Sequence, residues 1–106
     1  MQFPKQVEII EVGPRDGLQN EKNFVSTEQK KQLVERLAQA GFSRIETASF
    51  VHPKVVPQMA DAPELANFSR KLGITFLVLT PNQKALTRAI EAGVPQIAVF
   101  VGASET

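Results

Sequence analysis

The sequence predicts an α/β domain in which a parallel β-sheet is covered by helices. Segments rich in β-branched and apolar residues alternate with segments whose apolar residues recur at helical spacing. The strand segments are apolar on both faces, which is typical of parallel strands buried beneath helices. The 106 residues therefore predict elements in the order βαβαβαβ. The crossovers between the parallel strands are expected to be right-handed.

The first strand is expected over residues 7–12, because this stretch is rich in β-branched residues. The overlapping stretch 11–21 reads EVGPRDGLQNE, and its glycines allow a tight strand-to-helix loop. The loop carries Arg15, a planar cationic donor fork for carbonyl or carboxylate oxygens. Next to it stands Asp16, a hard oxygen ligand for a divalent cation, or a base. Residue chemistry alone leaves open whether the two are functional or a solvated loop pair.

A helix and the second strand follow this loop. Ser26 with Gln29 three residues later is a capping-box start, and the apolar stripe that follows ends at Gly41. Residues 44–50, RIETASF, have strand composition and lead into a loop punctuated by prolines. Alternation along this strand puts Arg44, Glu46 and Ala48 on one face and Ile45, Thr47 and Ser49 on the other.

The same pattern then repeats twice. Asp61 with Glu64 predicts the start of a second helix. Residues 74–80 form a nearly unbroken apolar strand, Asn82 can cap a third helix, and residues 96–101 complete a fourth strand.

Two architectures fit this order of elements, an open doubly wound sheet and a (β/α) barrel, and periodicity does not distinguish them. An eight-stranded barrel needs roughly 250 residues. As a barrel, the chain would be about its first half, so we expect residues 1–106 to be the N-terminal part of one domain, truncated after the fourth strand.

Composition narrows the classes of partner. The net charge of +1 and the lack of any basic run argue against nucleic acid and an anionic membrane. With no cysteine, the sequence contains no disulfide framework, thiolate metal site or cysteine nucleophile. The start, MQFPKQVEII, shows neither an apolar signal core nor an Arg-rich presequence, and no apolar run is long enough to span a bilayer. A cytoplasmic location is therefore expected.

Several separated blocks of the sequence carry a family resemblance. GPRDGLQNE resembles the N-terminal motif of the 3-hydroxy-3-methylglutaryl-CoA lyase family, metal-dependent lyases built on TIM barrels. The likeness extends in order to IETASFV at 45–51, PKVVPQM at 53–59, LTPN at 79–82 and ASE at 103–105. Related Claisen-type synthases share the RDG core but usually continue differently from the LQNE found here. The resemblance implies that the chain is the N-terminal part, about four βα units, of a TIM (β/α)8 barrel.

The resemblance also implies a reaction. The family cleaves its acyl-CoA substrate by a retro-Claisen step that gives acetoacetate and acetyl-CoA, in leucine degradation and ketone-body formation. By resemblance, Arg15 stabilises the negative charge that develops at the thioester carbonyl oxygen. Asp16 is then a direct ligand of Mg²⁺ or Mn²⁺. The full-length enzyme is expected to be a homodimer.

Three further residues are candidates. If Glu46 faces the barrel interior, its carboxylate needs a partner, and Arg15 is the expected one, held in place for catalysis. The alternative is a salt bridge that only supports the fold. Gln19 and Ser49 are weaker substrate-binding candidates, and Gln19 either meets substrate, orients Asp16 or merely satisfies loop backbone. His52, the only histidine, is expected to be a surface residue.

The sequence lacks several residues that belong to the family's active site. The family completes its metal site with a His-x-His pair and an Asn, and uses a Cys on a glycine-rich loop, none of which this chain supplies. One carboxylate does not hold an octahedral cation, so the 106-residue chain by itself is expected to bind metal weakly and to be inactive. Two alternatives stay open: a Claisen-condensing synthase or aldolase on the same scaffold, and a non-catalytic βα fragment that pairs with another chain.

Overall fold

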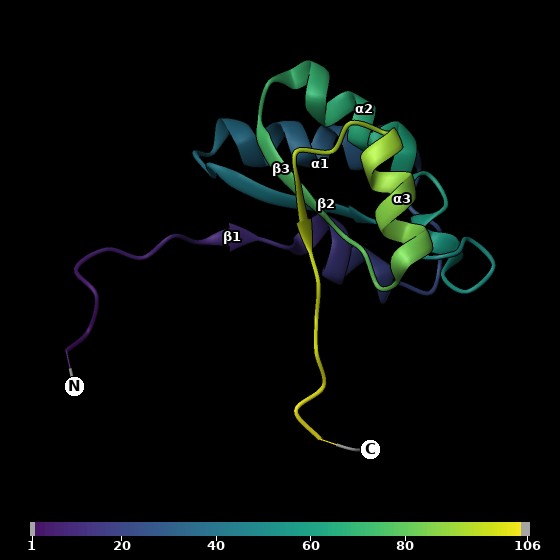
Figure 1. Cartoon of the computed structure of the whole chain (residues 1–106). Coiled ribbons are helices and arrows are strands. Elements are labelled where there is room, and N and C mark those ends of the chain that lie inside the picture. The colour runs from purple at the N-terminus through teal and green to yellow at the C-terminus, as the bar shows by residue number, and fades with distance from the viewer. Residues whose placement is uncertain (1, 105–106) are drawn as a thin grey trace.

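The computed structural model describes residues 2–104 and contains a four-stranded parallel sheet with helices packed on it (Figure 1). The strands are β1 (Ile10–Glu11), β2 (Arg44–Ser49), β3 (Thr75–Leu79) and β4 (Gln96–Ala98), and the helices are α1 (Thr27–Gln39), α2 (Ala62–Leu72) and α3 (Gln83–Glu91). A π-helical turn, Gly13–Gly17, follows β1, and a short 3-10 helix, Pro57–Met59, precedes α2. Glu105, in the last block of the resemblance, lies outside the described residues.

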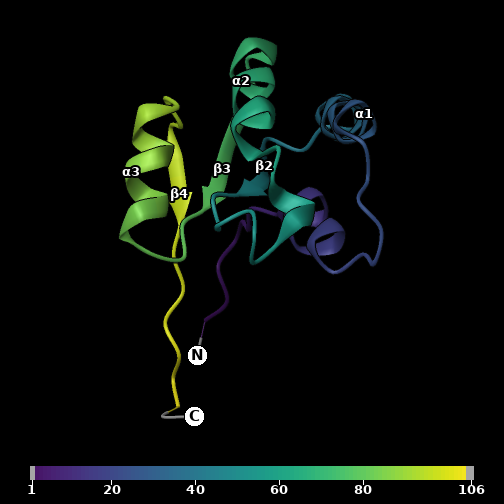
Figure 2. The same ribbon diagram turned by 90° about the vertical axis from the view of Figure 1, so that its right-hand side faces the viewer.

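The strand order selects between the two predicted architectures. The strands lie in the order β1-β2-β3-β4, and each neighbouring pair is parallel. Sequential order with right-handed crossovers puts every covering helix on the same face of the sheet. The three helices stand together on one side of the strands in both views (Figures 1 and 2). A doubly wound sheet would reverse its strand order and carry helices on both faces. The arrangement is therefore that of a (β/α) barrel segment.

Local sequence signals set the helix boundaries as predicted. Ser26 Oγ accepts a hydrogen bond from Gln29 N at 3.2 Å, and Asn82 Oδ1 accepts one from Ala85 N at 2.9 Å. Gly41 follows α1 with a φ of 104°, a left-handed conformation that glycine adopts without strain. Within residues 2–104, no helix combines the length and apolar character needed to cross a membrane.

The core lies between the helices and the two central strands. Its buried members come from β2, β3, α2, α3 and the residue after β2: Ala48, Phe50, Ala62, Leu65, Ala66, Phe76, Val78, Ala85 and Ala89. This packing explains why the central strands are apolar and why the helices are amphipathic.

The outer strands are shorter than predicted. The first was expected over residues 7–12, but β1 covers two residues, and Val7 is 79% exposed. The fourth was expected over 96–101, but β4 ends at Ala98. β-Branched composition favours extended backbone, yet a strand also needs a paired neighbour. Residues 7–9 and 99–101 have no ladder partner within the described part of the chain.

The predicted alternation along β2 was wrong beyond Glu46. The register aligns Glu46 with Leu77, Ala48 with Val78 and Ser49 with Leu79, so Thr47 is an extra residue. Such a β-bulge shifts the side chains that follow it to the opposite face. Ala48 therefore joins the helix-side core. Glu46 and Ser49 share the other face, which is the interior of a barrel.

Asp61 precedes α2 as predicted, but its side chain makes no capping hydrogen bond. The carboxylate instead accepts from Thr27 Oγ1 and from Lys30 Nζ, each at 2.8 Å. A buried lysine offers a carboxylate a stronger partner than a backbone amide does.

Candidate active site

The Arg-Asp turn, residues 13–17, stands at the carboxyl end of β1 and packs against β2. Sequence analysis predicted a loop here, whereas the amides of Arg15 and Asp16 both donate to the Val12 carbonyl, at 3.1 and 2.7 Å. Glu11 Oε1 accepts from Gly13 N at 2.8 Å, and a methyl group at Gly13 would lie 2.9 Å from that oxygen. Glycine therefore lets Glu11 fold back and cap the turn. Barrel enzymes place their chemistry at this edge of the sheet.

Arg15 and Glu46 form the ion pair that the sequence predicted. Arg15 Nε donates to Glu46 Oε1, joining the turn to β2. The Glu46 side chain is 7% exposed and the Arg15 side chain 19% exposed. A carboxylate buried to this degree needs a cationic partner, and the pair in turn limits the rotamers of the guanidinium. Arg15 is thus held at its Nε, while its Nη1 donates to Asp16 Oδ1 at 3.4 Å.

Asp16 lies beside this guanidinium and faces solvent. Its Oδ1 is 3.4 Å from Arg15 Nη1, and its side chain is 58% exposed. Asn20 Nδ2 donates to the backbone oxygen of Asp16 at 2.8 Å. An exposed carboxylate on a braced backbone fits the predicted role of a metal ligand. Within residues 2–104, no cluster of three or more His, Cys, Asp or Glu side chains is placed to hold a metal ion. Asp16 thus fits as one ligand of a larger set.

Ser49 and Gln19 each contain a buried polar atom that has no hydrogen-bond partner among the described residues. These atoms are Ser49 Oγ, on the same face of β2 as Glu46, and Gln19 Oε1. A buried polar atom left unpaired costs about 1–3 kcal/mol, unless water or a ligand satisfies it. Thr47 and Ser69 contain such atoms too, so a substrate-binding role for Ser49 and Gln19 stays a prediction. Gln19 makes no hydrogen bond to Asp16; Asn20, which the sequence analysis missed, contacts its backbone instead.

His52 occupies the surface position expected for it. The side chain is exposed, and its Nδ1 accepts from Lys54 N at 3.1 Å. This bond closes the turn after β2, so the histidine has a local structural role.

A pocket of about 140 Å³ lies at the same edge of the sheet, lined by Phe50, His52, Asn82, Lys84, Ala85 and Arg88. Arg88 stacks over the Phe50 ring at 5.4 Å and reaches the Phe50 carbonyl at 3.4 Å. With Lys84 beside it, the pocket carries two cations, which suits anionic groups of a ligand.

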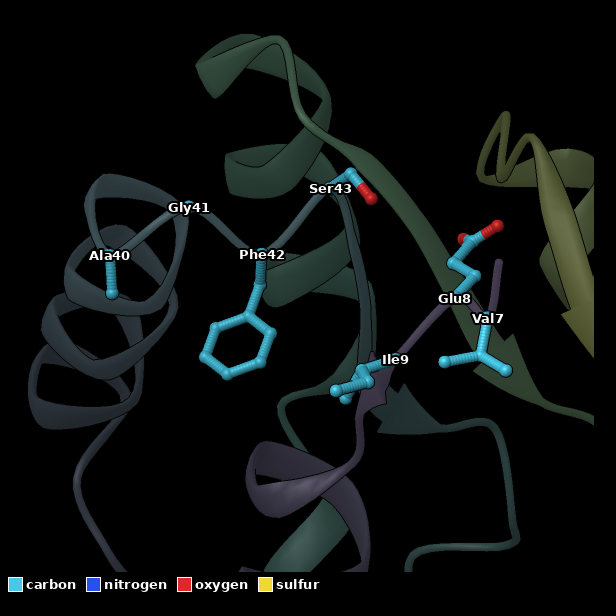
Figure 3. A pocket seen from close by; sticks show the side chains of 7 residues that line it. All are labelled: Val7, Glu8, Ile9, Ala40, Gly41, Phe42 and Ser43. Atoms are coloured by element: carbon cyan, nitrogen blue, oxygen red, sulfur yellow. The ribbon is translucent and has the colours of Figure 1, made fainter. Parts of the chain in front are cut away.

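A larger pocket, of about 390 Å³, lies at the opposite end of the sheet (Figure 3). Its lining residues precede β1 and β2 in the chain: Val7, Glu8, Ile9, Ala40, Gly41, Phe42 and Ser43. In parallel β/α folds this end supports stability, whereas chemistry occurs at the carboxyl ends of strands. Size alone therefore does not make it the active site, and the candidate residues all lie at the other end.

Comparison with known proteins finds relatives along almost the whole chain. Residues 6–106 match the model of the HMGL-like family. The chain is 54% identical to the mitochondrial hydroxymethylglutaryl-CoA lyase of Homo sapiens, over 97% of this chain and 32% of that protein. It is 48% identical to a hydroxymethylglutaryl-CoA lyase of Bacillus subtilis, over 100% of this chain and 36% of that protein.

Solved structures show the same fold. The HMG-CoA lyase of Bacillus subtilis superposes with a TM-score of 0.87 at 47% identity, covering 99% of this chain and 36% of that one. A lyase from Acinetobacter baumannii, solved with coenzyme A and 3-methylmalate, superposes with a TM-score of 0.84 at 40% identity, covering 92% of this chain and 32% of that one. The chain thus spans about a third of the length of these relatives. The predicted fold, part of a TIM barrel, is confirmed, and the chain belongs to the HMGL-like family.

Proposed function

We propose that the chain forms the N-terminal part of a lyase that cleaves 3-hydroxy-3-methylglutaryl-CoA to acetoacetate and acetyl-CoA. The observation that carries this proposal is the Arg-Asp turn, where Arg15 is held by the buried Glu46 beside the exposed Asp16. The relatives named as hydroxymethylglutaryl-CoA lyases support it, as does the relative solved with coenzyme A.

The reaction makes a specific demand on the site. The tertiary alcohol gives up its proton to a base, and the electron pair of the O–H bond forms the C=O double bond of the new ketone in acetoacetate. The carbon–carbon bond breaks, its electron pair passes to the thioester fragment, and protonation of that fragment gives acetyl-CoA. Negative charge therefore builds on the thioester oxygen in the transition state. A preorganised guanidinium stabilises this charge without having to reorganise, and Glu46 fixes Arg15 for that task.

Asp16 is the residue of this chain that would hold a divalent cation, Mg²⁺ or Mn²⁺. When bound, such an ion supplies Lewis-acid stabilisation of substrate oxygens. Ser49 and Gln19 would hydrogen-bond the substrate through the atoms that lack a partner among the described residues. The cationic pocket at Lys84 and Arg88 suits the anionic groups of coenzyme A. The cytoplasmic location, the dimer and the choice of metal stay predictions.

The test uses the complete enzyme, in which this chain is joined to the rest of the barrel, incubated with 3-hydroxy-3-methylglutaryl-CoA. We expect equal amounts of acetoacetate and acetyl-CoA, loss of activity on chelation with EDTA, and recovery with Mg²⁺ or Mn²⁺. The 106-residue chain alone serves as the inactive control. Absence of cleavage, together with condensation of acetyl-CoA with glyoxylate or pyruvate, would instead assign the enzyme to the synthases.

A further inference from the structure

Lys30, on the first turn of α1, is fully buried, with 0% of its surface exposed. Its Nζ donates to Asp61 Oδ1 at 2.8 Å and to the backbone oxygen of Gln58. The same nitrogen lies 4.4 Å from the centre of the Phe24 ring. The ammonium is thus satisfied by a carboxylate, a carbonyl and an aromatic face.

Stability alone gives a weak reason for this arrangement. Withdrawing an ammonium and a carboxylate from water costs several kcal/mol per ion, and apolar residues of similar volume are often as stable or more stable. A buried ion pair can instead fix one arrangement of the segments it joins. The segments joined here are α1, the loop after β2 and the start of α2.

Hydrogen bonds continue from this pair to the active site. Gln58, whose carbonyl accepts from Lys30, donates through its Nε2 to the Glu21 carbonyl at 2.7 Å. Glu21 N donates to the Leu18 carbonyl at 3.2 Å, directly after the Arg-Asp turn. A few residues later in the same segment, the half-exposed Phe24 ring lies against the Lys30 ammonium. The segment 18–24 is therefore contacted by Gln58 at Glu21 and by Lys30 at Phe24.

We propose that Lys30 and Asp61 are positioning residues that hold the Arg-Asp turn by fixing Gln58 against Glu21. That these residues position the turn is inferred from the hydrogen bonds alone. That the position of the turn affects catalysis rests on the proposed function. The assignment extends the site from the turn to the start of α2, through side chains that do not touch the reacting groups.

Hydrogen exchange of the complete enzyme tests the positioning directly. The variant K30M/D61L removes both charges together, so that neither is left buried and unpaired. We expect the amides of residues 15–21 to exchange about tenfold faster, because the turn opens locally, while the amides of β2 and β3 keep their protection. Unchanged exchange over 15–21 in a folded K30M/D61L enzyme would overturn the proposal.

A second variant, Gln58→Leu, keeps the ion pair and removes only the side-chain bond to Glu21. Gln58→Leu is expected to speed hydrogen exchange of the amides of residues 15–21 as well. If K30M/D61L does not fold, Gln58→Leu alone tests the proposal, and unchanged exchange in it would overturn the proposal. The matched control is Lys31→Met. Lys31 also pairs with an acid, Glu28 at 3.4 Å, and lies over a ring, Phe68, but no bond connects it to the turn. This control should leave residues 15–21 protected.

In the complete enzyme, Gln58→Leu is expected to lower kcat about fivefold and to change KM by less than about twofold, since the turn is displaced while most substrate contacts persist. Faster exchange with an unchanged kcat would overturn the role in catalysis. If the wild-type enzyme does not cleave the substrate at all, the proposed function fails, while the exchange result still decides whether Lys30 and Asp61 hold the turn.

Discussion

Replacing Arg15 with lysine is expected to lower kcat of the complete enzyme by about 10²–10³-fold, the cost of losing one preorganised donor to a developing oxyanion. Lysine keeps a positive charge beside the buried Glu46, so little stability should be lost. It replaces a planar fork with a single point charge, however, and cannot donate to Glu46 and to a substrate oxygen in the same fixed geometry. The deficit should therefore appear in turnover and not in folding.

Steady-state kinetics and thermal unfolding of the Arg15→Lys enzyme measure the two effects separately. Arg44→Lys is the matched control, because Arg44 also pairs with a glutamate, Glu8 at 3.2 Å, but at the opposite end of β2. The control should keep kcat within about twofold of wild type, because Arg44 lies at the start of β2, away from the Arg-Asp turn. A similar kcat for the two variants would show that the guanidinium at position 15 has no special part in the reaction.

Glu46→Gln is expected to lower kcat by about 10²-fold, the effect of misplacing a reacting group by about an ångström. Glutamine keeps the size of the side chain and an oxygen acceptor but removes the charge that holds Arg15. The guanidinium then samples other rotamers, and substrate binding, measured by KM, should change much less than kcat.

Thermal unfolding and kcat, measured side by side, separate the two interpretations of this carboxylate. A small shift in Tm with a large loss of turnover supports the positioning role. If stability and turnover fall in proportion, the ion pair serves only the fold. Glu8→Gln, which removes the partner of Arg44 at the other end of the strand, is the control and should leave turnover unaffected.

Helix boundaries were predictable because their causes are local. The caps at Ser26 and Asn82 and the glycine after α1 lie within a few residues of the bonds they make. The ends of β1 and β4 were not predictable in the same way, since pairing with a neighbour, and not composition, decides where a strand stops.

The bulge at Thr47 shows the same limit at the site itself. Strict alternation assigned Glu46 and Ser49 to opposite faces, whereas the register with β3 puts them on one face. Register is a property of two strands, so the pattern of one strand does not reveal it. The pairing of Arg15 with Glu46 was predictable, because a buried carboxylate demands a nearby cation.

Lys30 was missed although the sequence contained a signal. It stands four residues before Val34 and seven before Leu37, on the apolar stripe of α1, where a solvated lysine would not be expected. A charged residue at such a position requires a partner from another segment. Its partner Asp61 was instead interpreted as a helix cap, which is the local role that an aspartate most often takes before a helix.

A double-mutant cycle in the complete enzyme tests most directly whether Arg15 and Glu46 act as one unit. The kcat values of Arg15→Lys, Glu46→Gln and the double variant are compared with wild type. If Glu46 acts only by holding the guanidinium, the double variant should be no slower than Arg15→Lys alone, because no guanidinium is left for the carboxylate to hold. Losses that multiply would contradict the account, since Glu46 would then contribute to the reaction without Arg15.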